Sequence, residues 1–233
     1  MKKAFRAAFP VTVPVLLGYL FVGLAFGVLL RQEGYGPLWA AGMSVAVYAG
    51  SMQFVMLNFL GGGFSLVQVA LMTLAVNFRH LFYGLSFTER FRKMGKKRWY
   101  MIYSLTDETY SLLCSQRAPE GVEQGQFFFA IALLDELYWI AGAVLGTVVG
   151  GLLPFDTTGI DFAMTALFIV IAVEQWQAYK SRFPALWGAG CALACLLLLG
   201  PDRFLIPALL LAVLGLLAFA RPIVKKLGEE GEQ

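Results

Sequence analysis

Several side chains that can bind charge or transfer protons lie within one hydrophobic stretch of the sequence. The run Asn77-Phe78-Arg79-His80 is flanked by aliphatic and aromatic residues, and His80 is the single histidine of the chain. An arginine can bind a carboxylate through two parallel hydrogen bonds, and a histidine can exchange a proton near neutral pH. Because polar groups at membrane depth are costly, they usually mark a pathway or a site. The run therefore predicts a binding or proton-transfer site in a membrane protein.

Arg79 has two open interpretations. It lies about eight residues before the end of its hydrophobic segment, roughly 12 Å along a helix, so its guanidinium could reach the membrane interface. It could instead bind a substrate carboxylate, with Tyr83 nearby and His80 titrating during a transport cycle. A helix would place small or polar side chains on one stripe that should face protein or a cavity: Thr73, Asn77, His80 and Gly84.

Two pairs of adjacent carboxylates could pair with the arginine, bind an ammonium group or carry a proton. Asp107 and Glu108 follow Thr106, so they could simply form the first turn of a helix that Thr106 caps. They could also face a cavity and pair with Arg79 or bind a substrate ammonium group.

Asp135 and Glu136 lie about eight residues into a different hydrophobic segment, where an ionised group costs about 2.5–3.5 kcal/mol. One of them is expected to be protonated or paired. At least one is expected in a polar cavity, and the alternative is a structural pair at a helix–helix or subunit contact.

The stretch Ser44–Phe87 is broken by glycine at two places, Ala49-Gly50-Ser51 and Gly61-Gly62-Gly63. Irregular backbone at membrane depth is tolerated where protein buries it or where it lines a cavity. A helix that begins at Gly50 and Ser51 would offer backbone N–H groups to a carboxylate, and Gln53 lies just beyond them. The breaks therefore predict part of a substrate site.

The composition is that of a membrane protein with many spanning segments. Of the 233 residues, 59% are hydrophobic and 14% are charged, whereas soluble domains carry about 25% charged residues. A spanning helix needs about 20 apolar residues, which predicts an all-α polytopic membrane protein with about seven hydrophobic segments. These are Phe9–Leu30, Leu38–Leu60, Phe64–Phe87, Phe127–Leu153, Asp161–Tyr179, Phe183–Gly200 and Phe204–Ala220, with Trp99–Ser115 as a weaker eighth candidate.

Other classes of function lack support in the sequence. It contains no P-loop, dinucleotide fingerprint, nucleophile elbow or metal-binding pair, so neither an enzyme nor a cofactor or metal is expected. The net charge of +3 is small, and no basic face for nucleic acid is expected. The cysteines are interpreted as apolar packing residues: Cys114, Cys191 and Cys195.

The placement of lysine and arginine predicts the topology, because basic loops stay in the cytoplasm. Three full crossings before Arg90 would leave the six basic residues from Arg90 to Arg98 outside. Two crossings restore the rule, so one segment between Leu38 and Phe87 is expected to be re-entrant or built from half-helices. The chain, 1–233, is then one transporter domain with cytoplasmic termini, in which 88–126 is a basic cytoplasmic linker with a short helix and 221–233 a cytoplasmic tail.

A short pattern also occurs twice. It consists of Tyr19, Gly23 and Gly27 in the first segment and of Tyr138, Gly142 and Gly146 in the fourth, at identical spacing. Internal repeats are common in transporters, but paired glycines also arise from ordinary close packing of helices. Both explanations are open.

Six motifs in this order cover nearly the whole chain. They are Gly18–Gly27, Ala49-Gly-Ser-Met-Gln-Phe54, Asn77-Phe-Arg-His-Leu-Phe-Tyr-Gly84, Thr106-Asp-Glu-Thr-Tyr110, Tyr138-Trp139 with Gly142 and Gly146, and Asp161–Phe168. Together they resemble the azaleucine-resistance (AzlC-type) permease family, the large subunit of branched-chain amino acid exporters. The chain departs from the family pattern at Phe21, where proline is frequent, and at Asp135-Glu136, where neutral polar residues are more frequent.

The resemblance implies export of valine, leucine or isoleucine across the cytoplasmic membrane, driven by the proton gradient, with a small multispanning partner subunit (AzlD-type). The expected substrate-binding residues are Gly50, Ser51, Gln53, Asn77, Arg79, Tyr83, Asp107 and Glu108, and the expected proton-coupling residues are His80, Asp135 and Glu136. The alternatives are a carrier for another small organic solute and, from a different class, a membrane-embedded enzyme or a structural subunit.

Overall fold

The computed structural model describes residues 1–152 and 182–200, together with residues 169, 172–173, 176, 204, 207–208, 210–216 and 218. The regular structure of this part of the chain is helical throughout, with no strand, which confirms the all-α prediction. Two compact units are present. Unit 1 comprises Met1–Phe64 and Val76–Ala163, and unit 2 comprises Ser65–Ala75 and Met164–Gln233.

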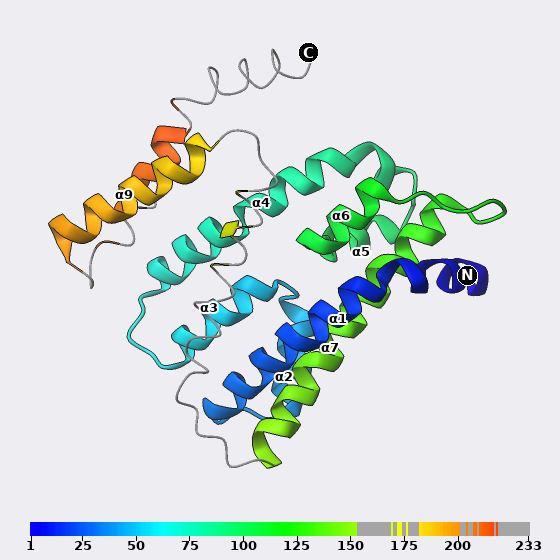
Figure 1. Ribbon diagram of the computed structural model, residues 1–233, viewed down its shortest axis with the longest axis horizontal. Helices are drawn as coiled ribbons and strands as arrows, with labels where there is room; N and C mark the ends of the chain where they lie inside the picture. The colour runs from blue at the N-terminus through cyan, green and yellow to red at the C-terminus, as the bar shows by residue number, and fades with distance from the viewer. Residues whose placement is uncertain are drawn as a thin grey trace. The chain divides into compact units, whose positions relative to one another are not determined.

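The described helices follow the hydrophobic segments of the sequence (Figure 1). The segment Leu38–Leu60 forms two helices instead of one, and Trp99–Ser115 also forms two. The segments Asp161–Tyr179 and Phe204–Ala220 lie partly outside the described residues. The helices are α1 (Lys2–Gln32), α2 (Pro37–Ala46), α3 (Gly50–Leu60), α4 (Leu66–Arg92), α5 (Lys97–Tyr103), α6 (Asp107–Ser115), α7 (Gln124–Leu152) and α9 (Phe183–Leu199).

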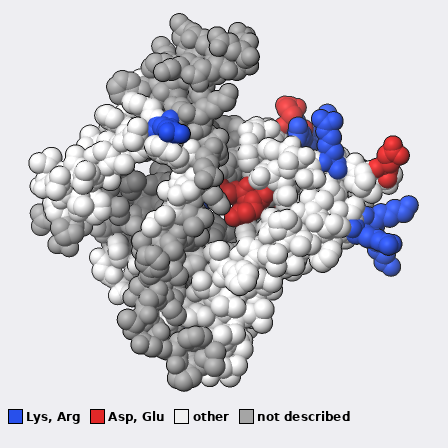
Figure 2. All heavy atoms as spheres, viewed as in Figure 1, with Lys and Arg blue, Asp and Glu red and all other residues white. Residues whose placement is uncertain are grey.

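Two of the described helices, α1 and α7, are long and apolar enough to cross a membrane. Helix α4 is a third candidate, bent by 51° between Leu81 and Tyr83. This count covers only the described residues, and it does not confirm the expected seven segments. Large apolar side chains are exposed on these helices, including Phe21, Leu85 and Leu152. On the face shown in Figure 2 most charged side chains gather at one edge, and most of the remaining described surface is uncharged.

Helices α1 and α7 lie side by side (Figure 1) and touch through their glycines. A Cβ atom added to Gly27 would lie 2.1 Å from the Ala143 carbonyl oxygen, and one added to Gly146 would lie 2.2 Å from the Leu24 carbonyl oxygen. Without a side chain at these positions the two backbones are in van der Waals contact. Such packing is an important source of helix association in lipid, which supplies no hydrophobic driving force between helices. The glycines are therefore packing residues.

The glycine contacts also give the relative direction of the two helices. Gly23 faces Gly142, Gly27 faces Gly146, and Gly150 faces Val28. Residue numbers rise together along both helices, so α1 and α7 are parallel and begin at the same end of unit 1. The two copies of the repeated glycine pattern therefore pack against each other.

The connection between α2 and α3 is a sharp break in the helix. Tyr48 has φ 36°, a conformation that is uncommon for a residue with a bulky side chain. Helix α2 ends at Ala46 and α3 begins at Gly50. The break predicted at Ala49-Gly50-Ser51 is thus present. The second predicted break is also a turn, in which Gly62 and Gly63 have φ of 85° and 87°, values that favour glycine.

Contacts with α1 and α7 show that α3 returns toward the side from which α2 comes. Helix α2 starts just after α1 ends. At the start of α3, Gly50 packs against Trp139, and one turn later the Phe54 ring lies 5.6 Å from the Phe26 ring. Gly142 faces Gly23, and Trp139 lies about one turn before Gly142. Phe26, which follows Gly23 in α1, is therefore nearer the C-terminal end of the helix pair than Trp139 is. Helices α2 and α3 therefore form a hairpin that enters and leaves at the C-terminal end of the α1–α7 pair.

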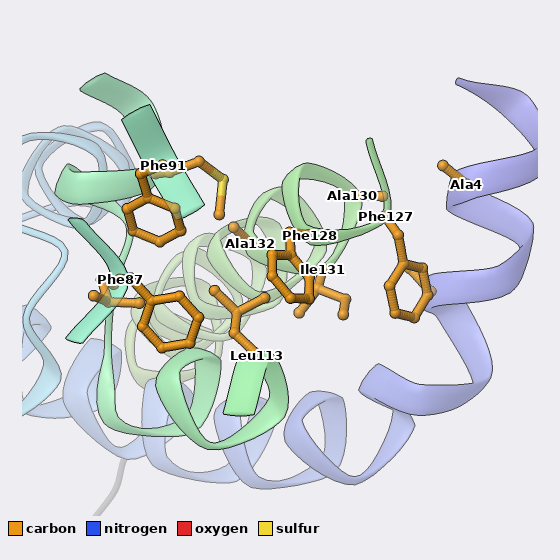
Figure 3. Close-up of a cluster of buried hydrophobic side chains, with 12 residues drawn as sticks. Ala4, Phe87, Phe91, Leu113, Phe127, Phe128, Ala130, Ile131 and Ala132 are labelled. Carbon is orange, nitrogen blue, oxygen red and sulfur yellow. The ribbon is translucent and has the colours of Figure 1, made fainter. Parts of the chain in front are cut away.

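A cluster of aromatic and aliphatic side chains closes the other end of unit 1 (Figure 3). Phe87 and Phe91 stack on each other on α4, and Phe87 meets Phe128 of α7 edge to face. The start of α1 joins them through Ala4. The Met1 ammonium group donates a hydrogen bond to Gln126. The end of α4 thus lies beside the starts of α1 and α7, so the basic residues from Arg90 to Arg98 lie at the same end of the unit as Lys2, Lys3 and Arg6.

Substitution of Gly27 by alanine tests the glycine contact. The new methyl group would overlap the Ala143 carbonyl oxygen, and overpacking typically costs about 1–3 kcal/mol. We expect Gly27→Ala to lower the Tm of the detergent-solubilised protein by at least about 2 °C. Gly18→Ala in the same helix is the matched control, because nothing lies within 4 Å of a Cβ there. Equal Tm values for the two variants would contradict the proposed packing role.

Candidate functional site

The guanidinium of Arg79 joins the first turns of two short helices. Its Nη2 lies 2.9 Å from Asp107 Oδ2, in the first turn of α6. The same nitrogen donates a hydrogen bond of 3.0 Å to the Ser51 hydroxyl, in the first turn of α3. Three residues far apart in the sequence thus meet. The predicted pairing of Arg79 with one of the acids at 107 and 108 is confirmed.

Tyr83 completes this cluster from α4. Its hydroxyl donates a hydrogen bond of 2.6 Å to Asp107 Oδ1, so both carboxylate oxygens of Asp107 have a partner. Arg79 and Tyr83 are four residues apart, and this spacing places them on one helix face. The side chains of Arg79 and Asp107 are 25% and 31% exposed, so the ion pair is accessible to a small solute. Arg79 Nε is buried without a hydrogen-bond partner among the described residues.

Helix α6 begins as the sequence predicts. The Thr106 hydroxyl accepts a hydrogen bond from the Thr109 backbone N–H, and Asp107 and Glu108 form the first turn. Both interpretations of the acidic pair therefore hold together: the acids complement the positive end of the helix dipole, and one of them binds Arg79. Glu108 is exposed, and its Oε2 accepts a hydrogen bond of 2.7 Å from Tyr19 of α1.

Helix α3 begins without a capping side chain, because its N-cap residue is Ala49. The backbone N–H groups of a first turn have no partner within their own helix. Arg79 lies beside them through Ser51. The uncapped N–H groups of α3 and the guanidinium of Arg79 lie side by side, and both favour binding of an anion such as a carboxylate.

Gln53 belongs to a different, structural network. It is fully buried, its Oε1 accepts a hydrogen bond of 2.7 Å from Trp139, and its Nε2 donates one of 3.3 Å to Ser44. These bonds join α2, α3 and α7. The side-chain oxygen of Gln53 already accepts a hydrogen bond from Trp139. Gly50 packs on the same Trp139 ring. In the structure these two predicted substrate residues hold the hairpin in place.

The polar stripe of α4 faces inward. Asn77 and His80 are half-buried, whereas Leu81 and Leu85 are exposed. His80 Nδ1 lies 3.2 Å from the Asn77 carbonyl oxygen on its own helix, and the His80 ring meets the Tyr83 ring edge to face. The His80 ring therefore contacts the Tyr83 ring, and Tyr83 binds Asp107 of the ion pair. Asn77 Oδ1 is buried without a partner in the described part of the chain.

Asp135 and Glu136 are buried in α7 and bind different partners. Thr109 of α6 lies 2.8 Å from Asp135 Oδ2 through its hydroxyl, and Tyr100 of α5 donates a hydrogen bond of 2.5 Å to Glu136 Oε2. Each carboxyl group thus joins α7 to a short helix, which corresponds to the alternative of a structural pair at helix contacts. Asp135 Oδ1 has no partner among the described residues. In that same part of the chain no group of three His, Cys, Asp or Glu residues could hold a metal ion.

Comparison with known proteins identifies the family. The AzlC protein family model matches residues 14–153, which contain the first-turn residues of α3 and α6 and the whole of α4. The branched-chain amino acid transport protein AzlC of Bacillus subtilis is 44% identical over 96% of this chain and 87% of that protein. This chain belongs to the AzlC family.

Two further relatives are membrane proteins by name. An uncharacterized membrane protein of Haemophilus influenzae is 41% identical over 89% of this chain and 86% of its own length. The inner membrane protein YgaZ of Escherichia coli is 30% identical over 86% of this chain and 82% of its own length. No solved structure is significantly similar to this AzlC-family chain.

Four residues of the polar core were missed as site residues by sequence reasoning. Tyr19, Tyr100, Thr109 and Trp139 each bind a predicted residue. Aromatic and hydroxyl side chains are frequent in the hydrophobic segments of the sequence, so their type does not distinguish them. Their positions relative to the predicted acids depend on the packing of five helices. The spacing of residues in the sequence gives no information about that packing. Tyr19 did stand out as part of the repeated glycine pattern.

A double-mutant cycle tests the Arg79–Asp107 ion pair. Arg79→Ala and Asp107→Ala each leave one charge without its partner, so the two effects on Tm should not add. We expect a coupling energy of about 0.5–3 kcal/mol, the range for residues in contact.

The matched control for this cycle is Glu89→Ala combined with Arg79→Ala. Glu89 is exposed and lies on the same helix, more than two turns beyond Arg79 and past the bend. We expect additive effects for this pair, because distant sites act independently. Additive effects for Arg79 and Asp107 would show that their contact contributes no energy.

Proposed function

We propose that this protein is a secondary transporter that exports branched-chain amino acids across the cytoplasmic membrane. The observation that carries the proposal is the accessible ion pair of Arg79 and Asp107, held between the first turns of α3 and α6. The kinship with the Bacillus subtilis branched-chain amino acid transport protein supplies the class of substrate.

The ion pair matches the two charges of an amino acid. A zwitterion carries a carboxylate and an ammonium group on one carbon atom, and it can be bound by a cation and an anion that lie side by side. On binding, the carboxylate would replace Asp107 on Arg79 and reach the uncapped N–H groups of α3. The ammonium group would bind Asp107 or the neighbouring Glu108. The two protein charges neutralise each other when the site is empty, which lowers the cost of keeping them in the membrane.

Proton coupling is assigned to the titratable groups around this site. His80 lies next to Tyr83, which binds Asp107. Asp135 and Glu136 lie deeper, on α7. A proton on any of these groups changes the local charge, so proton uptake and substrate release can be linked. Export by proton exchange, and a small AzlD-type partner subunit that covers part of the exposed apolar surface, complete the proposal.

The proposed topology has both chain termini in the cytoplasm. Helix α7 starts at the same end as α1, so the intervening chain must cross the membrane an odd number of times to return. The α2–α3 hairpin enters and leaves on one side, and α4 supplies the return crossing. This arrangement keeps Arg90 to Arg98 beside the cytoplasmic start of α1, as the charge distribution requires.

Transport of radiolabelled leucine or valine tests the function. We expect efflux from loaded proteoliposomes that contain the protein and its partner subunit, under an imposed pH gradient. Arg79→Ala and His80→Ala should each lower the efflux rate by at least about tenfold, the equivalent of ~1.4 kcal/mol. Arg79→Ala removes the carboxylate ligand, and His80→Ala removes a proton carrier.

Arg92→Ala is the matched control for Arg79→Ala, because it removes an exposed arginine from the same helix. We expect normal efflux in this variant. No efflux by the unmodified protein would disprove the proposed function. Normal efflux in Arg79→Ala and His80→Ala would show that these two residues have only structural roles.

Cysteine labelling tests the topology. In a variant without native cysteines, Gly62→Cys should react with a membrane-impermeant thiol reagent added outside, because the turn after α3 is proposed to face outward. Lys96→Cys should react only after permeabilisation, because it lies in the basic cytoplasmic cluster. Labelling of both positions from outside would rule out the re-entrant hairpin.

A further inference from the structure

An unbroken line of polar groups runs from the carboxyl group of Glu108, an exposed residue, to the buried carboxyl group of Asp135. Tyr19 OH lies 2.7 Å from Glu108 Oε2 and 2.8 Å from Thr106 Oγ1. Thr106 Oγ1 lies 3.1 Å from Thr109 Oγ1, which lies 2.8 Å from Asp135 Oδ2. Four hydrogen-bond contacts therefore join five side chains from α1, α6, α7 and the residue before α6.

A count of hydrogen atoms shows that this line needs one additional proton. The hydroxyls of Tyr19, Thr106 and Thr109 supply three hydrogens for four contacts. With both carboxyl groups ionised, Tyr19 donates to Glu108, Thr109 donates to Asp135, and Thr106 donates to Thr109. The contact of 2.8 Å between Tyr19 and Thr106 then has no hydrogen. Two oxygen atoms at that distance repel each other unless a hydrogen lies between them.

A single proton on either carboxyl group completes the line. If Glu108 is protonated, it donates to Tyr19, Tyr19 to Thr106, Thr106 to Thr109, and Thr109 to Asp135, and the last two directions are those of the structure. If Asp135 is protonated, the hydroxyls turn and every hydrogen bond points the other way. In passing from one state to the other, one hydrogen crosses each of the four contacts. As a result, one of the two carboxyl groups loses a proton and the other gains one.

The two ends of the line differ in exposure. Glu108 is exposed, whereas Asp135 is fully buried and its Oδ1 has no partner among the described residues. Burial of an ionised carboxylate with so few hydrogen bonds is costly, which favours a proton on Asp135. Glu108 lies beside Asp107, so its charge also depends on whether Asp107 is bound to Arg79 or to a substrate.

Other ionisable groups also face the line. Around Asp135 they are Glu136 on α7, Tyr100 on α5, and Tyr48 in the turn before α3, whose hydroxyl is buried without a partner in the described part of the chain. Around Glu108 they are Asp107 on α6 and Arg79 on α4. Arg79 is the only cation in these two sets, and Asp107 already neutralises it. The shared proton therefore removes one of the remaining negative charges.

We propose that Glu108, Tyr19, Thr106, Thr109 and Asp135 form a proton relay that carries one proton between the substrate site and the interior of unit 1. Tyr19, Thr106 and Thr109 act as positioning and relay residues, and the two carboxyl groups are the terminal carriers. The coupling to transport rests on the proposed export function. The relay itself does not, because the protonation of Asp135 can be measured without a substrate.

Infrared titration of the purified full-length protein tests the relay directly. We expect a carbonyl stretching band of a protonated carboxyl group that disappears in Asp135→Asn. Tyr19→Phe removes a hydroxyl that does not touch Asp135, and it should shift the titration midpoint of this band by about one pH unit, a tenfold change in proton affinity. The matched control is Tyr138→Phe, which removes a hydroxyl on α7 that binds Thr12 outside the line and should leave the midpoint unchanged.

Two infrared results would overturn the relay. One is the absence of any protonated-carboxyl band that Asp135→Asn removes. The other is an equal midpoint in Tyr19→Phe, Tyr138→Phe and the unmodified protein. Both results are independent of leucine, so they separate a failed relay from a failed export function.

Transport in proteoliposomes tests the coupling. We expect Tyr19→Phe and Thr109→Val to lower leucine efflux driven by a pH gradient at least about tenfold. Exchange of external for internal leucine should stay within about twofold, because exchange requires no net proton transfer. Thr109→Ser keeps the hydroxyl and should restore pH-driven efflux. Unchanged pH-driven efflux in Tyr19→Phe, or equal loss of exchange and pH-driven efflux, would overturn the coupling.

Discussion

The backbone contact between α1 and α7 is the interaction on which the other features of unit 1 depend. Gly23 and Gly27 meet Gly142 and Gly146 with no side chain between the helices. This close approach fixes the height of α7 relative to α1, and it brings Trp139 within 5.3 Å of the Tyr19 ring. Trp139 in turn holds Gln53 and the start of α3. The position of the α2–α3 hairpin thus follows from the glycine contact.

The parallel direction of this pair constrains the chain that joins its helices. The chain leaves α1 at one end and must return to the other before α7 begins. Helix α4 makes that return and carries Arg79 along the way. Two helices that are too short to span, α3 and α6, begin beside it and offer their first turns to its side chains. Half-helix N-termini at a central charge are a recurring arrangement in secondary transporters.

Much of this arrangement could be predicted from the sequence because local chemistry determines it. The break at Ala49-Gly50-Ser51 follows from glycine, and the start of α6 follows from Thr106 and the two acids after it. The pairing of Arg79 with an acid follows from the cost of an isolated charge in a membrane. The choice between Asp107, Glu108 and Asp135 could not be predicted, because it depends on the packing of α4 against α6.

Other parts of the site required the three-dimensional arrangement. Gln53 is polar and lies beside a break, features that favour a substrate ligand, yet Trp139 and Ser44 use its hydrogen-bonding groups. Tyr19 stands out in the sequence only as part of the repeated glycine pattern, yet its hydroxyl joins Glu108 to Thr106. Residue type indicates which groups can form hydrogen bonds, whereas the fold decides which of them are already occupied.

The glycine contact also determines which elements of unit 1 can move during a transport cycle. Backbones that touch without side chains cannot slide or separate without losing many contacts at once, so α1 and α7 form a fixed frame. Around Arg79 the helices α3, α4 and α6 meet through side chains: polar contacts of Arg79 and Tyr83 with Ser51 and Asp107, and the stacked rings of Tyr83 and Tyr110. The helices that carry the ion pair are therefore held to one another by side-chain contacts, whereas the pair that frames them is held by its backbone.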